Sequence, residues 1–540
     1  MEAADASGGR PTPGLISISC AGLWSAPTFA TMLSKFAPLA WISEMFQTTR
    51  HTPYESGCGT LCRSLSKCGW SKFSAGTVGR FAAWVTLTAV LTAGSGSKFA
   101  QGGEPHRARA DQTAPDPAAV ERGCAALTLR GYLKPTWKDD AITKVRKLWE
   151  NASPDPVADP KGYAAAFRAR YGLHLPPYPN DGLPMGLRRG VLRDGTKTGI
   201  QLDCLLCHGG SLGGVSYVGL GNTQLDMTLL LRELTNSEGR QMPPSLFILN
   251  SARGTNNAGM VSVVLLSLLN SDFSRRVFPL PMGANLPELD VPPWWNLAKK
   301  RSMYYDGRTD ARSVRSIMQF FMGEKSLDEM KRLEPIFQDV QTYLKSLKPP
   351  KYPFPIDRER AEHGRTVFEK TCARCHGTYG EHASYPNKII PLDVIGTDPA
   401  RATGLSRKFV EHYNSTWFGK DFPADLEMTG YQAPPLDGIW ASAPYLHNGS
   451  APTLWTVLKS KERPKLFLRP PSTEFEHYDR TNVGWKFEPL AEEAVSALTP
   501  ARRRGLYDAS RFGLGNQGHT FGDKLSDDDR REVIEYLKTL

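Results

Sequence analysis

Two five-residue stretches decide the fold of this chain, Cys204–His208 (CLLCH) and Cys372–His376 (CARCH). Both have the C-x-x-C-H spacing that is the attachment signature of c-type haem. Two thiols at this spacing can each form a thioether with one haem vinyl group, and the adjoining histidine then supplies a ligand to the iron. With nine cysteines and 11 histidines in 540 residues, only about 0.003 such motifs are expected by chance. The sequence therefore predicts two covalently attached c-type haems.

Zinc binding and dithiol redox chemistry explain the two motifs less well. A C-x-x-C pair that binds zinc needs a second ligand pair nearby, and thioredoxin-like chemistry would not require the histidine twice. The predicted haem attachment and proximal ligand residues are Cys204, Cys207 and His208 for the first haem and Cys372, Cys375 and His376 for the second.

Composition and charge narrow the classes of partner. The chain is 40% hydrophobic and 22% charged, with a net charge of +11, and its length suits two or three domains. Basic residues interleave with acidic ones, which indicates a solvated surface and no nucleic-acid partner. The positive excess is compatible with an acidic redox partner protein or an anionic surface, and the sequence favours neither.

The first part of the chain carries an export signal. At residues 80–100 an arginine precedes a short apolar run and then small residues, the pattern of a signal peptide. Because a signal peptide belongs at the start of its protein, we interpret residues 1–79 as a misassigned N-terminal extension. Residues 101–123 predict a flexible polar linker. We expect a periplasmic or secreted protein with no membrane span in the mature chain.

A proline-rich segment at 348–357 predicts a boundary between two domains. We expect a first cytochrome c-like haem domain at 124–350 and a second at 351–540. The predicted fold class is mainly α, with two tandem haem domains and long irregular loops.

An internal repeat supports this division. The stretch Pro292–Gly307 parallels Pro434–Gly449 with the same spacing from the Pro-Pro pair to the glycine, which places Tyr305 opposite His447. The near-identical sequences YLKSL and YLKTL then end the two halves.

Two further motifs, APYLHNGSAPTL at 443–454 and GHTFG at 518–522, complete a family pattern. Together with the haem motifs they resemble the bacterial di-haem cytochrome c peroxidase superfamily, and the chain is most similar to its rubber-oxygenase-like branch. The resemblance covers roughly residues 195–540. It implies that His519 is the distal iron ligand of the second haem. It also implies that His447 lies in the haem pocket, hydrogen-bonded near a propionate, whereas a structural turn residue is the alternative for His447.

The first half has no histidine that matches His519. Alignment of the two helix ends places its counterpart within residues 318–326. Met318 or Met322 is one candidate ligand there. Alternatively, Phe320 or Phe321 covers an open iron, as the resemblance implies.

Aromatic residues between the haem motifs are candidates for an electron bridge. Trp295 and Tyr305 belong to this set together with Trp294 and Tyr304, and ordinary packing is the alternative. The loop at 221–226 offers oxygen ligands that suit a Ca²⁺ ion between the domains, although oxygen ligands alone are a weak signal.

These features favour an exported di-haem oxidoreductase enzyme of the peroxidase or oxygenase type. The first haem would activate O₂ or H₂O₂, and the second would relay electrons. By resemblance, the substrate is peroxide or an unsaturated hydrocarbon. The alternative is a non-catalytic di-haem electron-transfer cytochrome in which both irons are six-coordinate.

Overall fold

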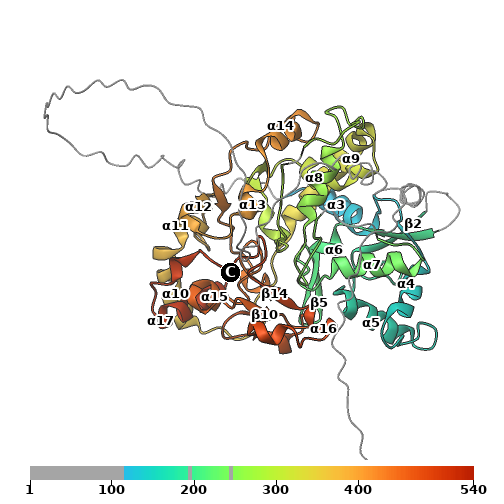
Figure 1. Ribbon diagram of the computed structural model, residues 1–540. Helices are drawn as coiled ribbons and strands as arrows, with labels where there is room; N and C mark the ends of the chain where they lie inside the picture. The colour runs from blue at the N-terminus through green and yellow to red at the C-terminus, as the bar shows by residue number, and fades with distance from the viewer. Residues whose placement is uncertain (1–114, 192–197, 243–246, 282) are drawn as a thin grey trace, which may run out of the picture. The chain divides into compact units, whose positions relative to one another are not determined.

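The computed structural model describes residues 115–540 except 192–197, 243–246 and 282 (Figure 1). The predicted N-terminal extension and signal peptide, and residues 101–114 of the predicted linker, lie outside the described residues. Among the described residues, 40% are helical and 12% are extended. The fold is therefore mixed rather than mainly α, and the arrangement as two tandem haem domains remains a prediction. None of the described helices combines the length and hydropathy that are needed to cross a membrane.

Helices make up most of the regular structure. The α-helices are α3 (Pro117–Leu129), α4 (Ala141–Lys144), α5 (Pro160–Tyr171), α6 (Leu205–His208), α7 (Met227–Ser237), α8 (Ala258–Ser267), α9 (Leu327–Ser346), α10 (Arg358–Thr371), α11 (Ala373–His376), α12 (Leu392–Ile395), α13 (Ala400–Thr403), α14 (Arg407–Ser415), α15 (Leu454–Leu458), α16 (Pro500–Arg503) and α17 (Asp527–Leu537). The 3₁₀-helices are η1 (Val145–Leu148), η2 (Trp294–Lys299), η3 (Arg315–Gly323), η4 (Ile439–Ala441), η5 (Ser460–Glu462), η6 (Phe475–His477), η7 (Glu492–Val495) and η8 (Thr520–Gly522).

The strands are short and pair only in antiparallel ladders. They are β1 (Trp137–Lys138), β2 (Leu187–Val191), β3 (Thr198–Leu202), β4 (Gly209–Leu212), β5 (Val215–Val218), β6 (Ser302–Met303), β7 (Thr309–Asp310), β8 (Ile389–Pro391), β9 (Gly430–Gln432), β10 (Leu466–Leu468), β11 (Tyr478–Asp479), β12 (Gly484–Trp485), β13 (Glu488–Pro489) and β14 (Leu506–Asp508). The two three-stranded sheets have the orders β1-β3-β2 and β13-β10-β14. Strands of two to five residues offer too little alternation for a sequence pattern to show, which explains why the sequence analysis predicted none.

Two helix pairs close the two halves of the described chain. Helix α10 packs along α17, and α3 packs along α9; these are the most extensive helix–helix contacts among the described residues (Figure 1). A glycine lies at each crossing. A Cβ atom at Gly123 of α3 would overlap the carbonyl oxygen of Asp339, and one at Gly364 of α10 would overlap that of Glu532. Because glycine has no side chain, the backbones approach at both crossings to a distance that no other residue permits.

The first helix begins earlier than the sequence predicted. Asp116 accepts a hydrogen bond from the amide of Ala118, and Pro117 occupies the first turn, a standard helix start. Residues 117–123, predicted as part of a flexible linker, thus belong to α3. They are ordered because α3 packs on α9 through Gly123.

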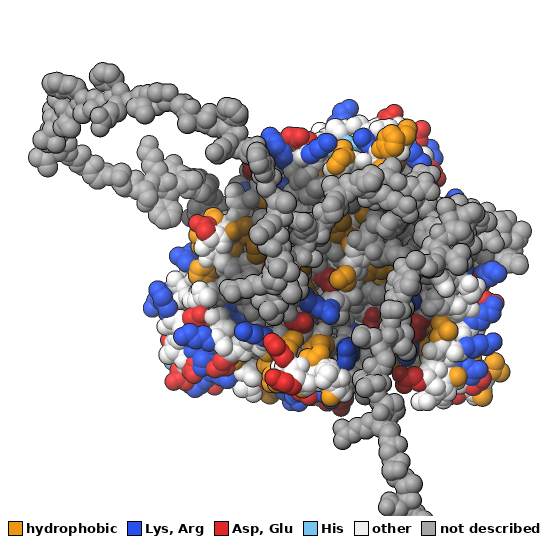
Figure 2. All heavy atoms as spheres, viewed as in Figure 1, with side chains coloured by type: hydrophobic (Ala, Val, Ile, Leu, Met, Phe, Trp, Pro, Cys, Tyr) orange, Lys and Arg blue, Asp and Glu red, His pale blue; other side chains and the backbone are white. Residues whose placement is uncertain are grey.

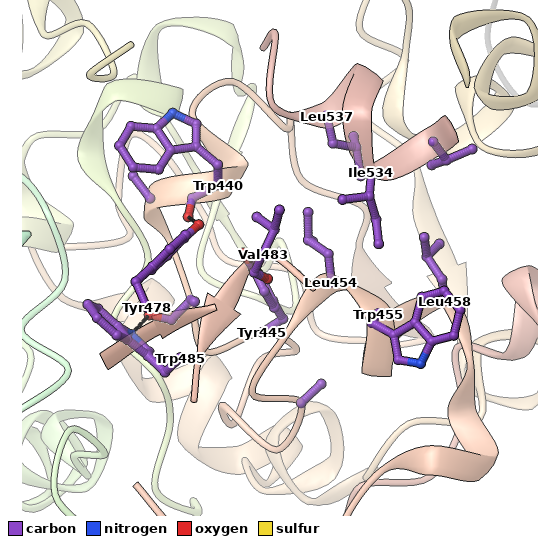
Figure 3. Packing of buried hydrophobic residues seen from close by; sticks show 14 of the residues in the cluster. Trp440, Tyr445, Leu454, Trp455, Leu458, Tyr478, Val483, Trp485, Ile534 and Leu537 are labelled. Atoms are coloured by element: carbon purple, nitrogen blue, oxygen red, sulfur yellow. Dashed lines mark hydrogen bonds between the residues drawn. The ribbon is translucent and has the colours of Figure 1, made fainter. Parts of the chain in front are cut away.

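In the sequence, Ser526 followed three residues later by Asp529 predicts the start of the final helix, and Gly364 and Phe368 are predicted to pack against that helix. The structure agrees with both predictions. The Ser526 hydroxyl accepts a hydrogen bond from the Asp529 amide, and the Asp529 carboxylate accepts one from the Ser526 amide, which forms a capping box. Ile534 and Leu537 of this helix lie on the large core of the second half, and aromatic residues such as Trp440 and Tyr478 extend the same core (Figure 3).

Candidate haem centres

The second motif begins where α10 ends. Cys372 lies between α10 and α11, so both cysteines and the histidine are on or next to the single turn of α11. Nδ1 of His376 is 2.9 Å from the carbonyl oxygen of Pro434. Because a carbonyl only accepts hydrogen bonds, Nδ1 carries the proton, and Nε2 keeps its lone pair. This is the tautomer that binds a metal through Nε2.

His519 faces His376. The centroids of the two imidazole rings are 6.2 Å apart, with an interplanar angle of 56°. Two metal–nitrogen bonds of about 2.0–2.1 Å each, added to the half-widths of two rings, give a spacing of this size. Nδ1 of His519 is buried without a hydrogen-bond partner. Burial, with the nearby His376 and Arg463 acting in the same direction, lowers the pKa of His519 to about 3, so the imidazole is neutral.

A buried arginine shapes the loop that carries His519. Nη1 of Arg463 donates to the carbonyl oxygens of Gly518 at 2.6 Å and Asn516 at 2.9 Å, and Nη2 donates to that of His519 at 3.2 Å. The amide of His519 donates to the carbonyl oxygen of Ile395 at 2.6 Å. Sequence reasoning missed Arg463, because no local pattern indicates that one side chain gathers carbonyls from a loop more than 50 residues away.

The first motif occupies α6. Burial lowers the pKa of His208 to about 3, and the Pro292 carbonyl opposes this shift, although Nδ1 makes no hydrogen bond of normal geometry. Pro292 and Pro434 are the first prolines of the two Pro-Pro pairs, so equivalent residues of the internal repeat adjoin the two motif histidines. Trp294 stacks on the His208 ring, with centroids 4.2 Å apart and an angle of 17°.

The hairpin β4–β5 follows the first motif directly. The Asn222 side chain donates to the carbonyl oxygen of Leu206 at 3.2 Å. His174, to which the sequence assigned no role, lies 3.1 Å from Asn222 Oδ1 through Nε2 and 2.7 Å from Ser211 Oγ through Nδ1. Ser211 in turn lies 2.6 Å from the Thr473 hydroxyl. This network fixes the hairpin to His174, which precedes it in the sequence, and to Thr473 in the second half.

The structure separates the candidates on η3. Phe321 is only 3% exposed and Met318 is fully covered, and Phe321 packs against Tyr132 and Phe337 of the core. In contrast, Phe320 leaves 39% of its surface uncovered. Of the two phenylalanines, only Phe320 therefore has a face available for a ligand.

Tyr304 contacts η3, the 3₁₀-helix that carries Phe320. Its hydroxyl is 3.2 Å from both the Ser316 carbonyl oxygen and Gln319 Nε2 on η3. It is 39% exposed, yet surrounding protein raises its pKa to about 12. The backbone of Tyr304 has a φ of 67°, which is unfavourable for a bulky residue and occurs mainly at functional sites.

Consecutive tryptophans contact the two halves. While Trp294 stacks on His208, Trp295 enters the core of the second half and donates from Nε1 to the carbonyl oxygen of Asp437 at 2.8 Å. Asn296 donates to the carbonyl oxygen of Pro435 at 3.1 Å, next to the proline that accepts from His376. Both tryptophans are bridge candidates from the sequence, and Trp294 is the one in contact with a motif histidine.

Tyr305 and His447, equivalent in the repeat, lie together. Their rings are 6.1 Å apart, and Tyr431 stacks on His447 at 4.3 Å. The Tyr305 hydroxyl donates to the carbonyl oxygen of Asp290 at 3.3 Å. Nε2 of His447 is buried and lacks a hydrogen-bond partner, and burial lowers its pKa to about 3.

The polar side chains Asn222 and Asp226 of the loop at 221–226 contact other residues of the protein. Asn222 holds carbonyls near the first motif, and the Asp226 carboxylate caps α7 and lies 3.5 Å from Arg504. Within the described part of the chain, no three His, Cys, Asp or Glu side chains converge as a metal site would require. Ca²⁺ binding therefore remains a prediction.

A mostly apolar cavity of about 740 Å³ lies beside α3. Tyr178 lines it, and its buried hydroxyl has no hydrogen-bond partner. The guanidinium of Arg188 lies 5.9 Å from the Tyr178 ring and 2.9 Å from the carboxylate of Asp203, the residue before Cys204. Arg188 thus links one lining residue of the cavity to the residue that precedes the first motif.

The chemistry of the donors fits c-type haem at both motifs. All four motif cysteines are free thiols, as thioether formation requires, and both motif histidines are neutral because burial lowers their pKa values. The side chains around the motifs are predominantly apolar or aromatic, as a haem environment should be.

Comparison with known proteins agrees with a cytochrome. Residues 430–468, which include Tyr431, His447 and Arg463, match a family model described as RoxA-like, cytochrome c-like. The match supports a relationship to the RoxA-like cytochrome c family and a protein that binds haem iron.

On the face drawn in Figure 2, basic and acidic side chains intermingle over the coloured surface.

Two relatives from Sinorhizobium fredii (strain NBRC 101917 / NGR234) are similar to this chain. The uncharacterized protein y4iM is 28% identical over 317 residues, which cover 50% of this chain and 70% of y4iM. The uncharacterized protein y4iJ is 27% identical over 330 residues, which cover 48% of this chain and 51% of y4iJ. The chain therefore spans about half the length of y4iJ.

Proposed function

We propose that this protein is an exported di-haem c-type cytochrome oxidoreductase with two unlike haem centres. The observation that carries the proposal is the asymmetry between the motifs: His519 faces His376, whereas η3 offers the uncovered ring of Phe320 and no histidine. Cys204, Cys207 and His208 would hold the first haem. Cys372, Cys375 and His376 would hold the second.

His376 and His519 are the proposed axial pair of the second centre. Their 6.2 Å ring spacing and their neutral state support this role. An iron held by imidazole on both faces has no free position, so this centre would relay electrons. Arg463 positions the loop of His519 through its carbonyl contacts.

The first centre is the proposed catalytic one. A haem with one open axial position binds and activates O₂ or H₂O₂. Phe320 and Tyr304 are the candidates to line that position, because each side chain is 39% exposed and the Tyr304 hydroxyl is held by η3. Trp294 positions His208 from the side through its ring stack.

Aromatic side chains offer an electron path between the centres. Trp294 contacts His208, and Trp295 lies in the core next to the second motif. Tyr305 with His447 is a second route, because these rings adjoin at the place where equivalent segments of the repeat meet. We assign the relay to this set, with a redox partner protein supplying electrons.

The cavity beside α3 supports one of the two substrate classes that the family resemblance implies. The apolar cavity beside α3 favours an unsaturated hydrocarbon over a polar substrate. Peroxide reduction is the other reaction that an open centre supports. A periplasmic or secreted location agrees with a cytochrome c-like domain, since c-type haem is attached outside the bacterial cytoplasm.

Electron paramagnetic resonance of the isolated holoprotein, with CO binding, tests the proposal. We expect one high-spin and one low-spin haem, with CO bound by one of the two. Two low-spin haems that ignore CO would contradict it. That result would favour a non-catalytic electron carrier, for which the buried methionines on η3, Met318 and Met322, are the candidate ligands.

A further inference from the structure

A group of arginines converges on one carboxylate at the start of α7, outside both haem motifs. Nε of Arg504, the residue that follows α16, lies 3.5 Å from Oδ2 of Asp226. Arg232 on α7 and Arg253 in the segment before α8 are close enough to act on the same carboxylate electrostatically. Three guanidinium groups from three separate segments thus surround Asp226.

Hydrogen bonds hold these segments together. The Arg253 amide donates to the carbonyl oxygen of Arg504 at 3.1 Å, and the Gly254 amide donates to that of Leu225 at 2.9 Å. Nη2 of Arg253 also donates to two carbonyl oxygens in the last turn of α5, at 2.6 and 2.8 Å. The backbone positions of the arginines are therefore fixed by the fold, which makes the cluster a preorganised one.

The charges of this cluster do not balance. Asp226 supplies one negative charge, and its carboxylate is also engaged as the cap of α7. Arg170 is nearby, but Glu233 neutralises it at 2.5 Å. Asp226 is the described acid that acts on Arg253, whereas Arg504 and Arg170 oppose the charge of Arg253. A surplus of positive charge therefore remains around Asp226.

The arginines also have donors that the protein does not use. A guanidinium has five N–H donors, and the enclosed Nε atoms of both Arg253 and Arg504 have no hydrogen-bond partner among the described residues. The Arg504 side chain keeps 26% of its surface exposed, and Arg232 is exposed. A ligand from solution can therefore reach the cluster.

The arrangement of the donors favours one class of anion. A phosphate group has strong acceptor oxygens that point in several directions, so guanidinium groups from separate segments can bind it together. A planar carboxylate instead matches the fork of a single guanidinium.

We propose that Arg232, Arg253 and Arg504 form a binding site for a phosphate group at the start of α7. Asp226 keeps the three guanidinium groups together, and the surplus positive charge attracts the anion. Inorganic phosphate and the phosphate of a lipid headgroup are the two sources of this chemistry. The site depends neither on the ligands of the two haems nor on oxygen activation.

The test compares wild-type holoprotein with holoprotein carrying Arg504→Gln. Inorganic phosphate is titrated by calorimetry while sodium chloride keeps the ionic strength constant, so that screening does not change. We expect saturable binding to the wild type and a loss of affinity of about tenfold or more in R504Q, which lacks charge-assisted hydrogen bonds to the anion. R407Q is the matched control, because Arg407 is exposed and pairs with Glu411 and Glu427.

Vesicles distinguish the two sources of the phosphate group. Co-sedimentation uses phosphatidylcholine vesicles with and without phosphatidylglycerol. Binding to the anionic vesicles that R504Q loses, without binding of inorganic phosphate, identifies a lipid headgroup as the ligand. The proposal is overturned if the wild type binds neither probe, or if R504Q binds them as the wild type does. Equal losses in R504Q and R407Q also overturn it, because net charge alone would then explain the binding.

A second variant keeps the test decisive. If R504Q does not fold by circular dichroism, Arg232→Gln replaces it, because the exposed Arg232 side chain can be shortened without disturbing the core. Wild-type affinity for both probes in folded R232Q then overturns the proposal. The spin states and CO binding of the two haems test the proposed function separately and leave the phosphate result as it stands.

Discussion

The two haem motifs adjoin equivalent proline carbonyls but differ in everything else around their histidines. His376 donates to Pro434 and faces a second imidazole, whereas His208 adjoins Pro292 and is stacked by an indole. The common part is what the internal repeat encodes. The difference lies in the residues that precede the last helix of each half, His519 in one and η3 in the other, and the proposed separate tasks of the two halves would depend on it.

Among the changes that would distinguish the two motifs, removal of either cysteine pair should have the largest effect, which is a loss of covalent haem. The double variants Cys204→Ala/Cys207→Ala and Cys372→Ala/Cys375→Ala should each lose half of the covalent haem, because each pair anchors one haem. Pyridine haemochromogen and intact mass measure this. Cys124→Ala is the matched control and should retain both haems. Full haem content in either double variant would contradict attachment at that motif.

Replacement of His519 should change only the second centre. In His519→Gly the second haem should turn from low-spin to high-spin, since its sixth ligand is gone, and added imidazole should restore the original spectrum. Electron paramagnetic resonance measures the change. His447→Gln should keep the low-spin signal, as should His382→Ala on the surface. A low-spin second haem in the His519 variant would transfer the ligand role to another residue.

Alanine at the helix crossings should destabilise both halves. Gly364→Ala and Gly123→Ala should each lower the free energy of unfolding by about 1–3 kcal/mol, because an added methyl group forces two backbones apart. Urea denaturation measures this. Lys370→Ala, on the exposed face of α10, should change stability by less than about 0.5 kcal/mol. Equal stability of the glycine variants and this control would mean that the crossing tolerates side chains.

Acid should destabilise the fold through His174, which contacts the hairpin that follows the first motif. Burial lowers the pKa of His174 to about 4, so its imidazole is neutral in the folded state. The unfolded chain then binds the proton more readily, and stability should fall as the pH drops from about 6.5 to about 4. Arg463, which organises the second centre, stays charged over this range.

His174→Gln isolates this contribution. Its unfolding free energy should fall less steeply with acid than that of the wild type, as measured by urea denaturation at pH 7, 5 and 4. The exposed His382→Gln variant should follow the wild type. Parallel profiles of the His174 variant and the wild type would exclude a neutral buried His174 as the source of acid sensitivity.

The sequence predicted those features of the fold and site that depend on short sequence patterns. The two motifs, the cap of the final helix and the packing of Gly364 and Phe368 against that helix follow from local spacing and periodicity, and the structure agrees with the last two. Tyr305 and His447 are equivalent positions of the repeat, and their rings lie 6.1 Å apart, a contact that the sequence did not predict.

The remaining features depend on contacts between distant segments. Arg463 and Arg401 are buried cations whose neighbours come from elsewhere in the chain, and nothing near them in sequence marks them as internal. The mixed fold class was missed because the strands are too short to show alternation. The early start of α3 was missed because its order comes from α9, about 200 residues away.

The glycine crossing of α10 and α17 also determines a distance within the second centre. Helix α10 leads directly into Cys372, and the loop of His519 leads into α17. If the two helices slid past each other by one turn, about 5.4 Å, the imidazoles of His376 and His519 would be displaced by a similar amount. The two rings are now 6.2 Å apart. If they hold one haem iron as we propose, the axial register of this helix pair would set the number of ligands that the iron has.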